Sequence, residues 1–91
     1  MPNPFVFTVA TTTVTLDHAV KGTVFELVQA SATAATGIIS DLNGSVLVSV
    51  ACPATIGSYP LVPQSPIILP KTNPLTVTVT GAGAKFNVHY R

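Results

Sequence analysis

Apolar and polar residues alternate strictly over the last part of the chain. In 75–80 every second residue is Leu or Val and the residues between them are Thr, and the alternation resumes over 85–90. A period of two is that of a β-strand, whose successive side chains point to opposite faces. We expect two strands that form a hairpin across Gly81–Ala84. Its core face would carry Val77, Val79, Phe86 and Val88, and its outer face Thr76, Thr78 and Asn87.

Short apolar segments with strand-forming residues recur along the rest of the chain, separated by turn residues. The dipeptide Asn43-Gly44 is a strong hairpin signal between two of them. The first two segments form either two strands or one long bent strand. We predict strands at 5–10, 12–16, 23–31, 36–40, 45–51, 59–62 and 66–69.

Helix signals are nearly absent, and one helical turn near Asp17–Lys21 is the only one that we expect. The length of 91 residues suits one domain, which we place at 1–91, with 1–5 as a candidate extended N-terminal arm. The predicted fold class is all-β: a single antiparallel β-sandwich, jelly-roll or immunoglobulin-like, of seven or eight short strands. The Pro-rich segment Pro60–Pro74 fits a stiff connector along a sheet edge, with a ligand for a Pro-recognising module as the alternative.

Charge is unusually scarce. Charged residues make up 8% of the chain, against about 25% in a typical soluble domain. The four basic residues are scattered, so we expect no nucleic-acid partner. No window of about 20 apolar residues exists, so we expect no membrane partner. The N-terminal residues lack the features of a signal peptide, which predicts synthesis in the cytoplasm.

No motif in the chain indicates catalysis or a cofactor. Cys52 is the only cysteine and follows an apolar segment, which favours a small buried side chain over a reactive thiol. Asp17 and His18 are neighbours that fit a turn better than a catalytic pair. His89 stands among polar residues on the predicted outer face, and no residues have metal-ligand spacing. We therefore expect no enzyme, no metal and no cofactor.

The outer face of the predicted sheet raises a question of solubility. Small proteins usually stay soluble through interspersed charges, and this chain has 13 Thr and 6 Ser instead. Either hydroxyl groups wet the surface, or copies of the chain or a larger partner cover it. The Thr-x-Thr spacing also resembles the flat Thr arrays of ice-binding proteins, but here it extends over one or two strands.

The closing segment TVTVTGAGAKFNVHYR, the Thr/Val/Ala/Gly-rich strands and the scarcity of charge resemble small virion proteins of tailed bacteriophages, with capsid cement (decoration) proteins as the nearest subgroup. The resemblance implies a β-sandwich that sits on the capsid exterior as a trimer or dimer and binds a major capsid protein. That group has no shared motif from which site residues could be transferred. Our candidate partner-interface residues are Pro2, Asn3, Pro4, Phe5, Thr76 and Thr78.

Two alternatives remain open at this point. One is a glycan- or receptor-binding sandwich of the tail-fibre or adhesin type. It is weakened by the absence of Trp and by the presence of only two tyrosines, Tyr59 and Tyr90. The other is a neck or tail adaptor of the same kind of particle.

Overall fold

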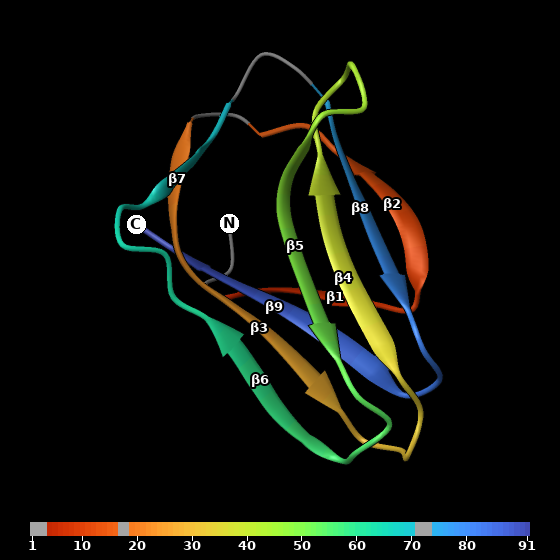
Figure 1. The fold of residues 1–91 in the computed structure, drawn as a ribbon. Helices are drawn as coiled ribbons and strands as arrows, with labels where there is room; N and C mark the ends of the chain where they lie inside the picture. The colour runs from red at the N-terminus through yellow and green to blue at the C-terminus, as the bar shows by residue number, and fades with distance from the viewer. Residues whose placement is uncertain (1–3, 17–18, 71–73) are drawn as a thin grey trace.

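The structure is a computed structural model that describes residues 4–16, 19–70 and 74–91. These residues form nine β-strands and no helix, packed as two sheets (Figure 1). The first two predicted segments form two separate strands, one in each sheet, which gives nine strands where seven or eight were expected. The strands are β1 (Phe5–Thr8), β2 (Ala10–Val14), β3 (Val20–Gln29), β4 (Ala35–Ser40), β5 (Val46–Cys52), β6 (Gly57–Leu61), β7 (Ile67–Leu69), β8 (Leu75–Thr80) and β9 (Ala84–Tyr90).

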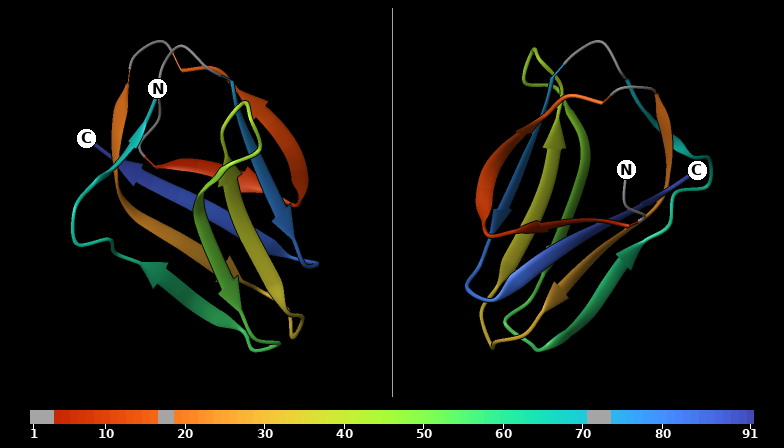
Figure 2. Two further views of the ribbon diagram at one scale, coloured as in Figure 1. Left: turned by 45° about the horizontal axis from the view of Figure 1, so that its top comes forward. Right: turned by 180° about the vertical axis from the view of Figure 1, so that it is seen from behind.

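The pairing of the strands follows a simple rule. β4 pairs with β5, β3 with β6, β2 with β8 and β1 with β9, all antiparallel, so the chain resembles a long hairpin with the β4–β5 turn at its tip. Rolling that hairpin up produces a five-stranded sheet, β1-β9-β3-β6 with β7 also paired to β3, and a four-stranded sheet, β2-β8-β4-β5. The two layers are visible in both views of Figure 2. This strand order is that of a jelly roll, one of the two sandwich types that the sequence left open.

The predicted hairpin of 75–80 with 85–90 is wrong. Both segments are strands, but β8 belongs to the four-stranded sheet and β9 to the five-stranded sheet. The connection at 81–83 therefore crosses from one sheet to the other. The predicted core face is confirmed, because the buried residues of β8 and β9 meet across the core from opposite sides. Apolar and polar residues alternate in the same way in a hairpin and in a crossover between two sheets, so the alternation could not distinguish the two.

Glycine makes this crossover possible. Gly81 has φ +100° and Gly83 has φ +79°, which is left-handed backbone that side chains disfavour. A Cβ at Gly81 would also lie 2.6 Å from the carbonyl oxygen of Ala34. The chain thus needs glycine here to turn tightly between the sheets.

A buried glutamine supports the same end of the sandwich. Gln29, at the end of β3, is 1% exposed, and its Oε1 accepts a hydrogen bond of 3.1 Å from the backbone N–H of Ser31. Its Nε2 donates to the carbonyl of Thr33. The Ser31 hydroxyl in turn donates to the carbonyl of Ala82. The Ser31 hydroxyl therefore links the two crossovers, 30–34 and 81–83, and Gln29 holds the first of them, although the sequence analysis singled out neither residue.

The predicted Asn43-Gly44 turn is confirmed. The backbone N–H of Gly44 donates to the carbonyl of Asp41 at 3.1 Å, and that of Asp41 donates to the carbonyl of Ser45 at 2.9 Å. Gly44 has φ +82°, so this is a tight turn followed by a glycine bulge. The Asp41 carboxylate accepts the backbone N–H groups of Asn43 and Ser45 and stabilises the turn.

Two other expectations concern the ends of β3. Val20 and Lys21 belong to β3, so the helical turn expected near 17–21 is wrong for these residues, while Asp17 and His18 lie outside the described residues. The expected position of the Pro-rich segment along a sheet edge is confirmed where β6 and β7 contain it, and residues 71–73 lie outside the described residues. Both pair only with β3 among the described strands.

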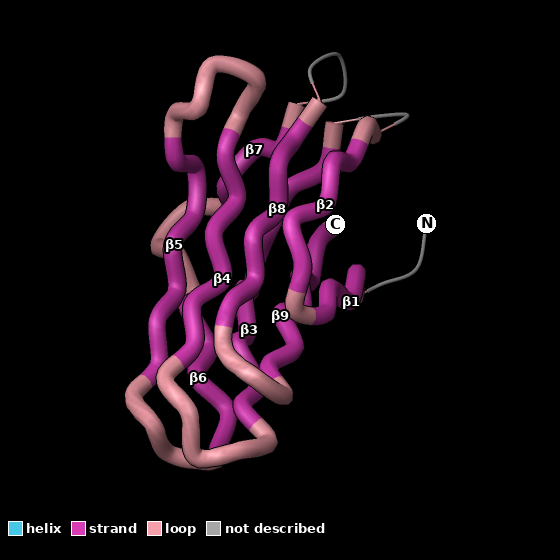
Figure 3. Tube along the Cα trace, turned by 90° about the vertical axis from the view of Figure 1, so that its right-hand side faces the viewer, coloured by secondary structure: helices cyan, strands magenta, loops and turns pink. Residues whose placement is uncertain are grey.

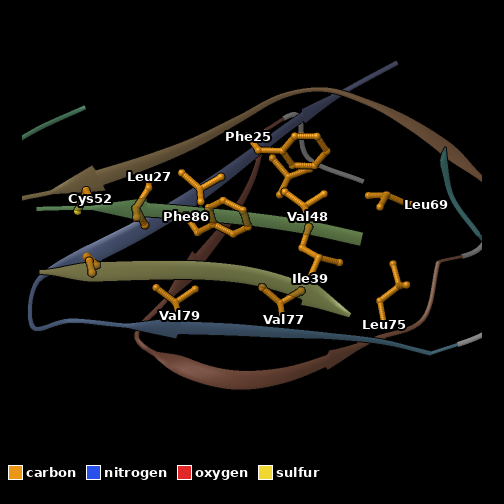
Figure 4. Packing of buried hydrophobic residues seen from close by; sticks show 14 of the residues in the cluster. Phe25, Leu27, Ile39, Val48, Cys52, Leu69, Leu75, Val77, Val79 and Phe86 are labelled. Carbon is orange, nitrogen blue, oxygen red and sulfur yellow. The ribbon is translucent and has the colours of Figure 1, made fainter. Parts of the chain in front are cut away.

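The core between the sheets is asymmetric. The two largest fully buried side chains, Phe25 and Phe86, both come from the five-stranded sheet (Figure 4). The ring of Phe86 packs on the backbone of Gly37 in the opposite sheet, where an added Cβ would lie 2.7 Å from its Cδ1. All six aromatic residues of the chain lie on strands of the five-stranded sheet: Phe5, Phe7, Phe25, Tyr59, Phe86 and Tyr90.

Candidate docking surface

The outer surface of the four-stranded sheet carries the most distinctive group of side chains in the molecule. Figure 3 shows its four strands running side by side. On β4, β5 and β8 alternate residues are buried in the core, with a bulge at the start of β5, and on β2 Thr12 and Val14 are half-buried, so the residues between them point outward. We call these outward residues the hydroxyl face: Thr11 and Thr13 of β2, Thr76, Thr78 and Thr80 of β8, Thr36, Ile38 and Ser40 of β4, and Val46, Ser49 and Ala51 of β5.

Strand register arranges these side chains in rows. Thr13 pairs with Thr76, which pairs with Ser40. The row across Thr78 continues to Ile38 on one side and to Thr11 on the other. In the third row the hydroxyls of Thr36 and Thr80 are hydrogen-bonded to each other. Eight of the eleven residues carry a hydroxyl and none is charged, so the face combines hydrogen-bonding groups with methyl groups.

The outer surface of the five-stranded sheet is different, and we call it the charged face: Lys21, Glu26, Lys85, Asn87 and His89, with neighbouring Val6, Thr8, Val24, Val28 and Ser58. Glu26 is at its centre. One carboxylate oxygen accepts the Ser58 hydroxyl at 2.6 Å, and the other accepts the side-chain amide of Asn87 at 3.1 Å. The hydrogen bond from Ser58 is the largest cause of the lowered pKa of Glu26, followed by the one from Asn87 and by the nearby His89. All three lower the pKa because they favour the ionised carboxylate over the protonated form.

The candidate interface residues fall into three groups. Thr76 and Thr78 lie on the hydroxyl face, half-buried between neighbouring strands. Phe5 lies in β1, pairs with Val88 and stacks on Tyr90 with ring centroids 5.2 Å apart. It is therefore part of the sheet, and the expected arm at 1–5 ends before it. Pro4 precedes β1 and is half-buried, while Pro2 and Asn3 lie outside the described residues.

The residues considered for catalysis are not brought together. Cys52 is buried and belongs to the four-stranded sheet, as expected for a small core side chain. His89 is on the outer side of the other sheet, where β9 is flanked by β1 and β3. Within 4–16, 19–70 and 74–91, no three His, Cys, Asp or Glu side chains gather as they would around a metal ion.

A small cavity lies inside the sandwich near its β1 and β2 side. It measures about 10 Å³ and is lined only by apolar residues, among them Phe5, Phe7, Leu16 and Ile39. That is room for about one water molecule, and an apolar site of this kind offers water no partners. The cavity therefore does not suit a small-molecule ligand.

Of the hydroxyl face, the sequence analysis identified only the part on β8. The other strands carry less regular patterns, such as Ile38 next to Ser40, and their contribution depends on which strands pair. The tract 12–15 echoes 76–80 in the sequence and was the one available signal. In the structure β2 does lie beside β8, with Thr11 opposite Thr78.

Comparisons with known proteins do not indicate a function, so the function has to be inferred from these surfaces. No protein-family model matches the chain, and neither the curated proteins nor the solved structures include a match. The described residues include no helix long and apolar enough to cross a membrane.

Proposed function

We propose that this protein is a non-enzymatic structural component of a tailed-bacteriophage particle. It acts as a capsid cement protein that binds the outer surface of the major capsid protein through the hydroxyl face. The observation that carries the proposal is the contrast between the two outer surfaces: one sheet presents eleven outward residues without a charge, while Lys21, Glu26 and Lys85 all lie on the other.

The energetics of docking favour such a surface. Sub-micromolar binding requires about −8 kcal/mol, and standard interfaces bury roughly 800 Å² on each partner. Burying an unpaired Lys or Glu over that area costs several kcal/mol. Thr and Ser cost far less, because a hydroxyl needs only one or two hydrogen bonds and the Thr methyl group is apolar. The hydroxyl face can therefore be covered without leaving ions unpaired.

The fold is compatible with this role but does not decide it. Jelly rolls occur in viral capsid proteins and also in lectins, so fold alone is an analogy. A glycan-binding role would be supported by exposed aromatic side chains. Tyr59 is instead half-buried with its hydroxyl bonded to the carbonyl of Thr55 at 2.8 Å, and Tyr90 stacks on Phe5. The site thus supports shell docking better than glycan binding.

The first experiment locates the protein in purified particles. Labelled antibodies against the chain, viewed by electron microscopy, should decorate the capsid exterior. The particles are then washed in low salt and in about 1 M salt, and the retained protein is measured. Retention should change little, because salt screens charges and leaves apolar and hydroxyl contacts largely intact. Label at the neck or tail would favour the adaptor or fibre alternatives, and loss of the protein at high salt would contradict docking through the hydroxyl face.

A second experiment tests the face itself. Particles stripped of the protein are incubated with the wild-type chain, with Thr78→Lys and with the matched control Thr8→Lys on the charged face. Thr78→Lys should weaken rebinding at least tenfold, because the new charge would be buried against the shell. Thr8→Lys should bind as the wild type does. Rebinding should also raise the melting temperature of the particles, and an unchanged melting temperature would contradict the cement role.

Ice binding is a second candidate function, favoured by the rows of hydroxyls across β2, β8 and β4. The sequence suggested an array of one or two strands, and the structure extends it to neighbouring strands about 4.8 Å apart, with outward residues about 6.8 Å apart along each strand. The purified chain would then slow the recrystallisation of ice, and Thr78→Val, which keeps the shape and removes the hydroxyl, would weaken the effect. No slowing at any concentration excludes this function.

A further inference from the structure

The free edge of β5 is a second surface with features of an interface. β5 ends the four-stranded sheet and pairs only with β4 among the described strands. An edge strand presents a row of unpaired backbone N–H and C=O groups on its open side, which can pair with another strand. The question is whether this edge is protected against such pairing, as natural sheet edges usually are.

Of the edge strands that the structure describes, β5 is the longest, and the others are short or contain a proline. β1 has four residues and β7 has three, which are too short for extended pairing. β6 contains Pro60, which has no N–H to donate. β2 has five residues and follows β1 at the bend where the chain changes sheets. β5 has seven residues, Val46–Cys52, without Pro or a charged side chain.

Exposed apolar side chains flank β5 at both ends. Leu42, in the turn before it, is 63% exposed, and Val46, at its start, is 58% exposed. Ile56, in the loop that follows it, is 65% exposed. A surface with apolar groups at each end of an unpaired strand is self-complementary, because an antiparallel copy places the start of one strand against the end of the other.

We propose that two copies of this protein pair through their β5 edges, antiparallel and about a two-fold axis at Ser49. The axis follows from the length of the strand, since only pairing centred on Ser49 aligns all seven residues. In this register Val48 lies opposite Val50 of the second copy, and Ser49 lies opposite Ser49 of the second copy. The Leu42–Val46 end of one copy meets the Ile56 end of the other. The result is a continuous eight-stranded sheet with closed two-fold symmetry.

This interface is distinct from shell docking and forms without a shell. The dimer joins two hydroxyl faces side by side into one wider surface, since β5 carries the last column of that face. The purified chain tests the dimer and the stripped particles test the docking, so failure of one proposal does not imply failure of the other.

The first test measures the mass of the purified chain by light scattering and by sedimentation, up to a concentration of about 1 mM. We expect a dimer that dissociates on dilution. Ser49→Lys places two like charges at the two-fold axis and should weaken association at least tenfold. The matched control Thr13→Lys, on the outward side of the opposite edge strand, should leave the dimer intact. Both positions are exposed, and an unchanged melting temperature of each variant at low concentration shows that it folds.

The second test fixes the register by disulfide formation in a Cys52→Ala background. Ser49→Cys should form an intermolecular disulfide with itself on oxidation, because the two residues face each other at the axis. Ala51→Cys alone should not, because the two copies of residue 51 lie apart on opposite sides of the axis. A chain that stays monomeric at every concentration overturns the proposal. So does a trimer, and so does a dimer that tolerates Ser49→Lys and does not cross-link through Ser49→Cys.

Discussion

The two sheets of the sandwich differ both in the side chains they send into the core and in those they turn outward. The five-stranded sheet contributes every aromatic residue, and Phe86 reaches across to Gly37 of its partner. Its outer surface carries ion-forming groups arranged around Glu26. The four-stranded sheet contributes aliphatic side chains and Cys52 to the core and an uncharged hydroxyl face to the outside. The aromatic side chains and the charged groups thus lie on one sheet, and the other sheet has an uncharged outer face.

The largest expected effect tests the core side of this comparison. Phe86→Ala should lower the free energy of unfolding by about 3–5 kcal/mol, because it removes one of the two largest buried side chains of the five-stranded sheet. Val79→Ala, the matched truncation from the four-stranded sheet, should cost clearly less, since it removes fewer buried atoms. Urea unfolding followed by circular dichroism measures both. Equal losses would mean that the two sheets share the core evenly.

The next effect tests the four-stranded sheet at Gly37, where the ring of Phe86 packs against it. Gly37→Ala should cost about 1–3 kcal/mol, because the new methyl group would collide with the ring of Phe86. The loss should shrink in a Phe86→Leu background, which relieves the collision. Gly57→Ala is the control, since its Cβ would meet nothing nearer than 3.6 Å. If Gly37→Ala costs the same in both backgrounds, the contact between the sheets is not the cause.

A smaller effect tests the charged face. The pKa of Glu26 is lowered in the folded protein, so its ionised form contributes stability above its ordinary pKa of 4.5, and that contribution is lost as the pH falls through the lowered value. Glu26→Gln should cost less than about 1 kcal/mol at neutral pH, because the group lies near the surface. The difference from the wild type should vanish in acid. Unfolding curves from neutral pH to below 4 check this, and a difference that grows in acid would contradict it.

The smallest effect is expected on the hydroxyl face. Thr78→Lys and Thr78→Ala should each change the free energy of unfolding of the monomer by no more than about 0.5 kcal/mol, because the side chain points outward. The same unfolding measurement applies. A loss as large as that of Phe86→Ala would show that this surface serves the fold, and the contrast between the two sheets would lose its functional meaning.

Strand positions and faces could be predicted from the sequence, because alternation reports directly which residues are buried. Segment 75–80 coincides with β8, and the residues expected in the core are buried. Pairing could not be predicted in the same way. A connection as short as 81–83 suits a hairpin as well as a crossover, and the two are distinguished only by the distant partners of each strand: β8 pairs with β2 and β4, and β9 pairs with β1 and β3.

The candidate surface was predictable only in part for the same reason. Thr76 and Thr78 stand out because they alternate with buried valines on a single strand. Ser49 and Ile38 carry no such signal. They join the face because β4 and β5 are placed beside β8 by a topology whose partners lie far apart in the sequence.

The rolled-up path of the chain has a consequence for how the protein forms. Of the eight successive strand connections, only β4–β5 joins hydrogen-bonded neighbours. Proteins dominated by such distant pairings fold in milliseconds to seconds. Formation of the five-stranded sheet depends on the last strand of the chain, because β9 separates β1 from β3 and pairs with both. During synthesis β1 and β3 leave the ribosome early, yet they have no common partner until Ala84–Tyr90 emerges. A nascent chain that stalls before that point can close its β4–β5 hairpin but cannot complete the sheet that holds its aromatic core.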